Sequence, residues 1–122
     1  MCRSASLTTA GRLRRIQPMF GNPMLFLVIS TPRPEKPSTM AASRQAFWHW
    51  MDPHLKSGLA QCSYARTGRG AVAVFNVDSN ETLHRLLNEW AEIIPATFDV
   101  YPLVDISASR KLLANQRRRA AK

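Results

Sequence analysis

Hydrophobic residues occupy consecutive positions at residues 24–29 (MLFLVI), and prolines follow at positions 32, 34 and 37. A short apolar run that ends in turn-forming residues is typical of a strand. Proline cannot continue a helix or the hydrogen bonding of a strand. The pattern therefore predicts a strand over residues 24–29 and a loop after it.

A helical pattern comes next and runs to about residue 51. Ser38 or Thr39 is expected to cap this helix, because such a hydroxyl accepts from the free N–H groups of a first turn. Asp52 and Pro53 predict a kink or a restart, with Asp52 as the new cap. The apolar positions that share one face at 100° per residue are Met40, Phe47, Trp50 and Met51, with Trp48 at the edge of that face.

Residues 59–66 and 71–77 predict two strands joined by a turn at residues 67–70, which contains two glycines. In the first strand Ala60, Cys62 and Tyr64 share one side, and we expect that strand to be central in the sheet. The second strand (AVAVFNV) is apolar on both sides. The turn has too few glycines for a phosphate-binding loop, and no helix follows it.

The second helix has the clearest pattern in the chain. Asp78 is the expected cap, and Glu81 three residues later completes a capping motif. A last strand is predicted over residues 97–104, where Pro102 places part of it at a sheet edge or a bulge. The apolar stripe of the helix is Leu83, Leu86, Leu87 and Trp90.

The predicted element order, βαββαβ, is that of an α+β, ferredoxin-like subunit. In this fold two helices cover one face of a four-stranded antiparallel sheet, and the second face is left open. An antiparallel sheet with one wet face should alternate apolar and polar residues, but residues 24–29 and 71–77 do not alternate. We therefore expect a second copy of the chain to cover the open face, which makes a homodimeric α+β barrel.

The formal net charge of +9 comes from the two ends of the chain. Residues 1–23 contain four basic and no acidic residues, and residues 110–122 contain six basic and no acidic residues. Residues 24–109 contain seven basic and eight acidic residues. A duplex-binding protein needs a basic folded surface, so we expect nucleic acid to make at most non-specific contacts with the ends.

Three regions are predicted from these patterns. Residues 1–23 are expected to be a disordered or spurious extension, which we favour over a targeting signal. Residues 24–105 form the ferredoxin-like domain, and residues 106–122 form a basic tail. No apolar run is long enough to cross a membrane, so we expect a cytoplasmic protein. No metal-ligand spacing or dinucleotide motif is present, and we expect no metal and no cofactor.

The segments at residues 75–87 (FNVDSNETLHRLL), 98–103 (FDVYPL) and 24–28 together resemble the muconolactone delta-isomerase family. The resemblance implies a ferredoxin-like subunit in a dimeric barrel, which is often built into larger rings. It also implies cofactor-free chemistry that moves a double bond within an unsaturated lactone. The family has a charged first helix and an Arg- and Trp-rich second strand. The aromatic first helix and the strand at residues 59–66 here imply a different, more aromatic pocket.

Proton transfer of this kind needs a base beside a carbonyl and a donor for the developing enolate. His54, near the apolar face of the first helix, and His84, on the second helix, are the candidate bases. The alternatives are a loop position after Pro53 for His54 and a solvated helix flank for His84. Tyr64 is the candidate donor, and its alternative is simple packing on the sheet.

The candidate ligand contacts are aromatic or lie on strands. A small apolar carbonyl compound would contact Phe47, Trp48, Trp50, Cys62 and Tyr101. Tryptophans more often anchor a core or an interface, so that role remains open for Trp48 and Trp50.

Three functional hypotheses follow, in decreasing order of support. The first is a cofactor-independent isomerase or cyclase that acts on a small unsaturated lactone or related carbonyl compound. The second is a non-catalytic dimeric module of the same fold that binds a small molecule or serves assembly. The third is a nucleic-acid-associated protein that acts through its basic ends, which the neutral charge of the middle disfavours.

Overall fold

The computed structural model of the chain describes residues 24–121, and the predicted extension at residues 1–23 lies outside the described residues. The strands and α-helices between residues 24 and 103 follow one another in the order βαββαβ, as the sequence predicts. A short 3-10 turn precedes the first long helix, and a further helix follows the last strand. The elements are β1 (Met24–Pro32), η1 (Pro37–Met40), α2 (Ala41–Ser57), β2 (Ala60–Ala65), β3 (Ala71–Val77), α3 (Asn80–Ile93), β4 (Ala96–Leu103) and α4 (Ile106–Ala121).

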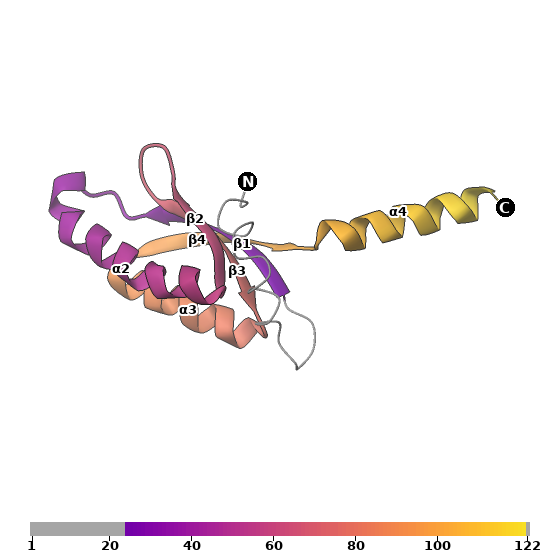
Figure 1. The fold of residues 1–122 in the computed structure, drawn as a ribbon. Helices are drawn as coiled ribbons and strands as arrows, with labels where there is room; N and C mark the ends of the chain where they lie inside the picture. The colour runs from indigo at the N-terminus through magenta and orange to yellow at the C-terminus, as the bar shows by residue number, and fades with distance from the viewer. Residues whose placement is uncertain (1–23, 122) are drawn as a thin grey trace.

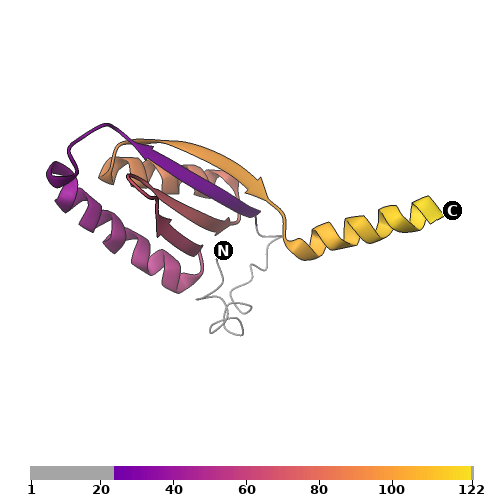
Figure 2. The same cartoon turned by 90° about the horizontal axis from the view of Figure 1, so that it is seen from above.

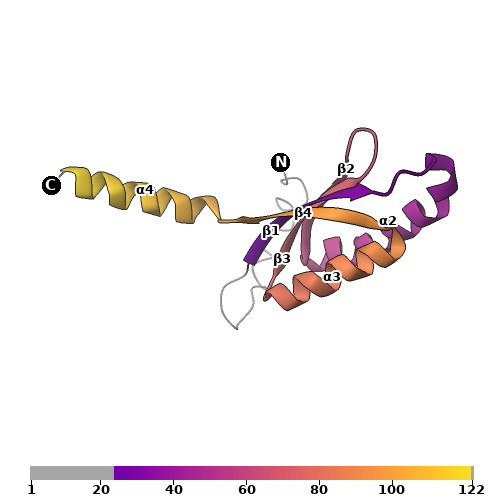
Figure 3. The ribbon, with the colours of Figure 1, turned by 180° about the vertical axis from the view of Figure 1, so that it is seen from behind.

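The four strands form one sheet in the order β2-β3-β1-β4. Every neighbouring pair is antiparallel. Helices α2 and α3 both cover the same face of this sheet, as the views from the front and from behind agree (Figure 1, Figure 3). The prediction of an α+β, ferredoxin-like subunit is confirmed.

Burial alternates along the two central strands. On β3 the side chains at positions 71, 73, 75 and 77 are buried under the helices, and the intervening ones are half-buried. The register pairs Val28 with Ala73 on the helix-covered face. The opposite face, which we call the open face, carries mostly apolar side chains from all four strands. Its central members are Leu25, Leu27, Ile29, Val72 and Val74.

The core is centred on Trp90 of α3, which is 1% exposed. Its ring lies against Phe47 of α2 at a centroid distance of 4.7 Å and against Phe98 of β4 at 5.2 Å. Phe75 of β3 lies beneath it at 6.4 Å. Full burial of a large aromatic side chain stabilises a fold by about 1.5–3 kcal/mol. One residue therefore joins both helices to the sheet.

The start of α3 differs from the prediction in its capping residue. Ser79, not Asp78, is the N-cap, and its hydroxyl oxygen accepts from the backbone N–H of Thr82 at 3.2 Å. The Asp78 carboxylate accepts instead from the Thr82 hydroxyl at 2.6 Å. This hydrogen bond is the main reason why the pKa of Asp78 lies below its ordinary value.

The first long helix corrects two further predictions. Ser38 and Thr39 lie in the 3-10 turn η1, and Met40 precedes α2 without a side-chain cap. The predicted restart at Asp52 is wrong, because α2 continues through Pro53 to Ser57. The packing of α2 against the sheet outweighs the hydrogen bond that a proline removes from a helix interior.

The second strand is an edge strand, not the central strand that we expected. A register irregularity between Ala60 and Cys62 changes which side chains share a face. Ala60 pairs with Phe75 and is buried under the helices, whereas Cys62 pairs with Val74 and therefore lies on the open face. An extra residue in a strand reverses the side-chain alternation after it. The predicted grouping of Ala60 with Cys62 and Tyr64 is thus wrong. The predicted edge position of Pro102 is confirmed, since β4 is the other edge.

The basic tail forms the helix α4, whose side chains are all exposed. It extends away from the sheet beyond the end of β4 (Figure 1, Figure 2) and packs against none of the other elements in the described chain. Asp105 caps its start by accepting from the backbone N–H of Ser107 at 2.9 Å. Among the described residues, no helix combines the length and the apolar character needed to cross a membrane.

Removal of residues 106–122 should leave the thermal midpoint of the domain within about 4 °C of that of the full chain. Changes that disturb no packed contact alter the free energy of unfolding by about 0.5 kcal/mol or less. In a domain of this size, 1 kcal/mol corresponds to roughly 4–8 °C. Calorimetry on the two chains measures the difference. A much larger fall would show that α4 is packed against another surface in solution.

Candidate functional site

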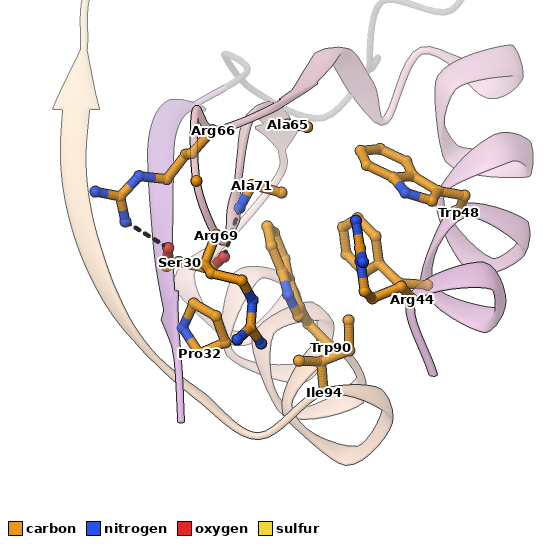
Figure 4. Close-up of a pocket in the computed structure, with 13 residues that line it drawn as sticks. Ser30, Pro32, Arg44, Trp48, Ala65, Arg66, Arg69, Ala71, Trp90 and Ile94 are labelled. Atoms are coloured by element: carbon orange, nitrogen blue, oxygen red, sulfur yellow. Dashed lines mark hydrogen bonds between the residues drawn. The ribbon is translucent and has the colours of Figure 1, made fainter. Parts of the chain in front are cut away.

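One pocket lies on the helix-covered side of the sheet, at the end where β1 leaves the sheet and β2 turns into β3. It encloses about 80 Å³. Trp48 and Arg44 approach it from α2, and Ser30, Pro32 and Arg69 lie on the opposite side, with Trp90 and Ile94 between them (Figure 4). The full lining is Ser30, Pro32, Arg44, Phe47, Trp48, Ala65, Arg66, Gly68, Arg69, Gly70, Ala71, Trp90 and Ile94.

Aromatic rings form the apolar walls of the pocket. Phe47 is buried, and Trp48 beside it is 36% exposed. The two rings meet edge to face at a centroid distance of 4.8 Å. The ring of Trp90 is tilted by 44° against that of Phe47. Such rigid rings offer a flat apolar surface at the mouth and the base of the pocket.

Three arginines line the same pocket, and its lining contains no acidic residue. Nη1 of Arg66 donates to the backbone oxygen of Ser30 at 2.8 Å and to the Thr31 hydroxyl at 3.2 Å. Nη1 of Arg69 donates to the backbone oxygen of Glu35 at 2.7 Å. Arg44 forms no hydrogen bond or ion pair with any residue in the described part of the chain. The pocket is therefore a region of positive potential.

A neutral donor accompanies the arginines. The hydroxyl oxygen of Ser30, a residue only 3% exposed, accepts from the backbone N–H of Ala71 at 2.9 Å. A hydroxyl that accepts one hydrogen bond still has its own proton to donate. The side chains of the pocket thus offer a ligand hydrogen-bond donors but few hydrogen-bond acceptors.

The turn between β2 and β3 positions Arg66 and Arg69, and its conformation depends on Gly70. The backbone N–H of Arg66 donates to the oxygen of Gly70 at 2.9 Å and closes the predicted turn. Gly70 has a φ of +103°, and a Cβ there would lie 2.5 Å from the backbone oxygen of Ser30. Only glycine lets the turn approach β1 this closely. Arg66 and Arg69 reach the pocket because of this approach.

A polar cluster lies between α2 and α3. Nε1 of Trp50 donates to the Glu89 carboxylate at 2.9 Å, and Arg85 forms an ion pair with the same carboxylate at 3.1 Å. The hydrogen bond from Trp50 is the main cause that holds the pKa of Glu89 below its ordinary value. His54 packs edge to face on the Trp50 ring at 4.8 Å. Burial lowers the pKa of His54, and the Glu89 charge only partly opposes that shift.

The model of the DUF3303 family, described as a domain of unknown function, matches residues 24–117. The chain belongs to the DUF3303 family. The match includes all four strands, both helices that cover the sheet, and most of α4. No curated protein matches the chain. The resemblance to muconolactone isomerases gains no support from these comparisons.

The DUF3303 domain places the predicted site residues in four different locations. Phe47 and Trp48 line the pocket, as expected for ligand contacts. Trp50 and His54 belong to the cluster beside Glu89. His54 lies within α2, so the alternative of a loop position for it is wrong.

The remaining candidates lie further away. His84 is exposed on α3, where the Asn88 side chain donates to its backbone oxygen at 2.8 Å. Cys62, Tyr64 and Tyr101 all lie on the open face, because they pair with Val74, Val72 and Leu27 on neighbouring strands. The structure therefore does not bring His54, His84 and Tyr64 together. Their joint role in catalysis stays a prediction.

The polar and charged side chains of the pocket were not predicted as site residues; they are Ser30, Arg44, Arg66 and Arg69. Trp90 is visible from the sequence only as a core position. A weak signal was present at the turn at residues 67–70, where Arg66 precedes the turn and Arg69 lies between its two glycines. The described residues contain no group of three or more His, Cys, Asp and Glu side chains placed to hold a metal ion.

Acidification should weaken the fold through His54. Its pKa in the folded domain lies below 6.5, so the unfolded chain binds the proton more readily. The stabilising contribution is complete above pH 6.5 and is lost as the pH falls towards the folded pKa. The variant His54→Gln should show a flatter fall in the free energy of unfolding between pH 7 and pH 5, measured by urea unfolding.

The variant Gln45→Ala is the matched control, because it changes an exposed position of the same helix and removes no titrating group. It should keep the pH profile of the unmodified domain. Identical profiles for the unmodified domain and His54→Gln would contradict the assigned role of burial at His54.

Proposed function

We propose that this DUF3303 domain binds a small, planar, unsaturated or aromatic carbonyl compound in the pocket between α2, α3 and the β2–β3 turn. The observation that carries the proposal is the combination of aromatic walls with convergent donors in one cavity. Ligand pockets are typically apolar concavities with a few well-placed polar groups. Phe47 and Trp48 supply the flat surface, and the Ser30 hydroxyl and the arginines supply donors for an oxygen atom.

The size of the cavity limits how the ligand binds. An apolar cavity of about 150 Å³ can hold a benzene molecule, whereas this pocket encloses about 80 Å³. One edge of a planar molecule fits inside, and the rest lies against the partly exposed Trp48 ring at the mouth. This arrangement favours a ligand with one polar end and a flat body.

Binding is favoured over catalysis because of the chemistry of the lining. A proton-transfer reaction needs a base within reach of the substrate. Within the described residues, the lining contains no histidine, carboxylate, cysteine or tyrosine. A cofactor-independent isomerase that uses His54, His84 and Tyr64 therefore remains a prediction from the sequence. The non-catalytic binding module is the function that the geometry supports best.

Native mass spectrometry of the full chain from its own cells, with release and identification of bound molecules, tests the proposal. We expect a planar carbonyl compound, whose titration also changes the tryptophan fluorescence. Trp48→Ala should weaken its binding roughly threefold to tenfold, because aromatic contacts contribute about 0.5–1.5 kcal/mol beyond area burial. His49→Ala, the exposed neighbour on α2, is the control and should bind normally. Equal affinity of Trp48→Ala and the unmodified chain would place the ligand elsewhere.

We further propose that the chain is a homodimer joined through its open faces. The support is the run of apolar side chains that crosses all four strands there, including Tyr101, which is 52% exposed. Monomers rarely leave a large apolar sheet face in water. A second copy is the economical cover, since one patch then serves both partners.

Light scattering should give a mass of twice 13.7 kDa for the full chain. Tyr101→Lys should shift the protein towards the monomer, because it places a charge within the proposed interface, beside Leu27 of β1. His84→Lys, which adds a charge on the exposed side of α3, should leave the mass unchanged. A monomer for the unmodified chain would instead indicate that another segment of the chain covers the open face.

A further inference from the structure

We propose that the ligand of the pocket is an organic anion, a carboxylate attached to a flat conjugated or aromatic body. Its carboxylate lies between Arg44 and Arg69 beside the Ser30 hydroxyl, and its body lies against Trp48 and Phe47. This inference rests on the proposed function and adds the charge of the ligand to it.

The charge of the pocket is not a consequence of the composition of the domain. Residues 24–109 contain seven basic and eight acidic residues, yet three of those seven bases and none of the acids line this one cavity. Like charges in one small volume repel one another and are costly unless a counter-charge joins them. A bound anion supplies that counter-charge.

The three arginines differ in how free they are to bind a ligand. Arg66 holds the turn against β1 through two hydrogen bonds, so its role is structural. Arg69 uses one nitrogen on the backbone oxygen of Glu35 and keeps its other donors, since a guanidinium has five N–H groups. Arg44 is without any hydrogen-bond partner in the described chain. Arg44 and Arg69 face each other across the pocket (Figure 4).

Ser30 supplies the third donor. Ser30 lines the pocket, and its hydroxyl oxygen accepts from the backbone N–H of Ala71, so its own proton is left to donate. A carboxylate has two oxygens that together accept up to four hydrogen bonds. It therefore matches two guanidinium groups and one hydroxyl better than a neutral carbonyl oxygen does.

The aromatic walls distinguish a conjugated carboxylate from inorganic phosphate. Arginine binds both groups in a bidentate manner, so the arginines alone do not discriminate. A phosphate ion would leave the partly exposed ring of Trp48 uncovered, whereas the flat body of an aromatic carboxylate covers it. A guanidinium beside aromatic faces also attracts a planar conjugated anion.

Isothermal titration of the full chain with matched probes tests the inference. The anions are benzoate and cinnamate, the neutral analogues are benzamide and cinnamamide, and inorganic phosphate is the non-aromatic anion. We expect at least one carboxylate to bind at least tenfold more tightly than its amide. Phosphate should bind more weakly than that carboxylate and should not displace the carboxylate from the chain.

Arg44→Met should weaken carboxylate binding at least tenfold, and amide binding by much less. Arg44→Lys should give an intermediate loss, because it keeps the charge but not the planar fork. Lys56→Met removes an exposed cation from the same helix outside the pocket and should bind as the unmodified chain does. Arg44 is itself exposed, so Arg44→Met should fold normally, and circular dichroism verifies this.

The possible results separate the anion assignment from the proposed binding function. Equal affinity for a carboxylate and its amide, with no effect of Arg44→Met, would keep the proposed function and overturn the assignment of an anion. If phosphate binds as tightly as the carboxylates, the assignment of a conjugated or aromatic body to the ligand is overturned. If none of the five probes binds, both the anion assignment and the proposed binding function are overturned.

Discussion

The burial of Trp90 is the contact on which the rest of the domain depends. Its ring meets Phe47 of α2, Phe75 of β3 and Phe98 of β4, so a single side chain fixes both helices over one face of the sheet. The same ring forms the base of the pocket. Because a close-packed interior transmits small shifts, the core and the pocket cannot vary independently.

The second constraint is the close approach of the β2–β3 turn to β1. Gly70 lies so close to the backbone of Ser30 that no side chain would fit at its position. Arg66 binds the turn to the same strand by a hydrogen bond to the backbone oxygen of Ser30. This contact brings Arg69 opposite Arg44, and Ser30 lines the same pocket. The positive potential of the pocket therefore depends on the same contacts that hold the β2–β3 turn against β1.

Sequence patterns predicted most of the fold, and the errors have identifiable causes. The stripe that includes Leu83, Leu86 and Trp90 correctly gave a helix packed on a sheet, since burial imposes its period on the sequence. The bulge after Ala60 was not predictable, because one extra residue leaves the alternation within the strand looking intact. It moved Cys62 and Tyr64 to the open face, away from the helices.

By itself, the sequence determined the element order, the antiparallel sheet with two helices on one face, and the neutral charge of the domain between basic ends. These follow from local periodicity and composition, which a single chain displays directly. Only the tertiary structure decided the site. Ser30, Arg44 and Arg69 are separated along the chain and belong to no motif, so their meeting depends on the turn and the packing of Trp90. Convergence of donors is a property of three-dimensional distance, and no spacing along the sequence records it.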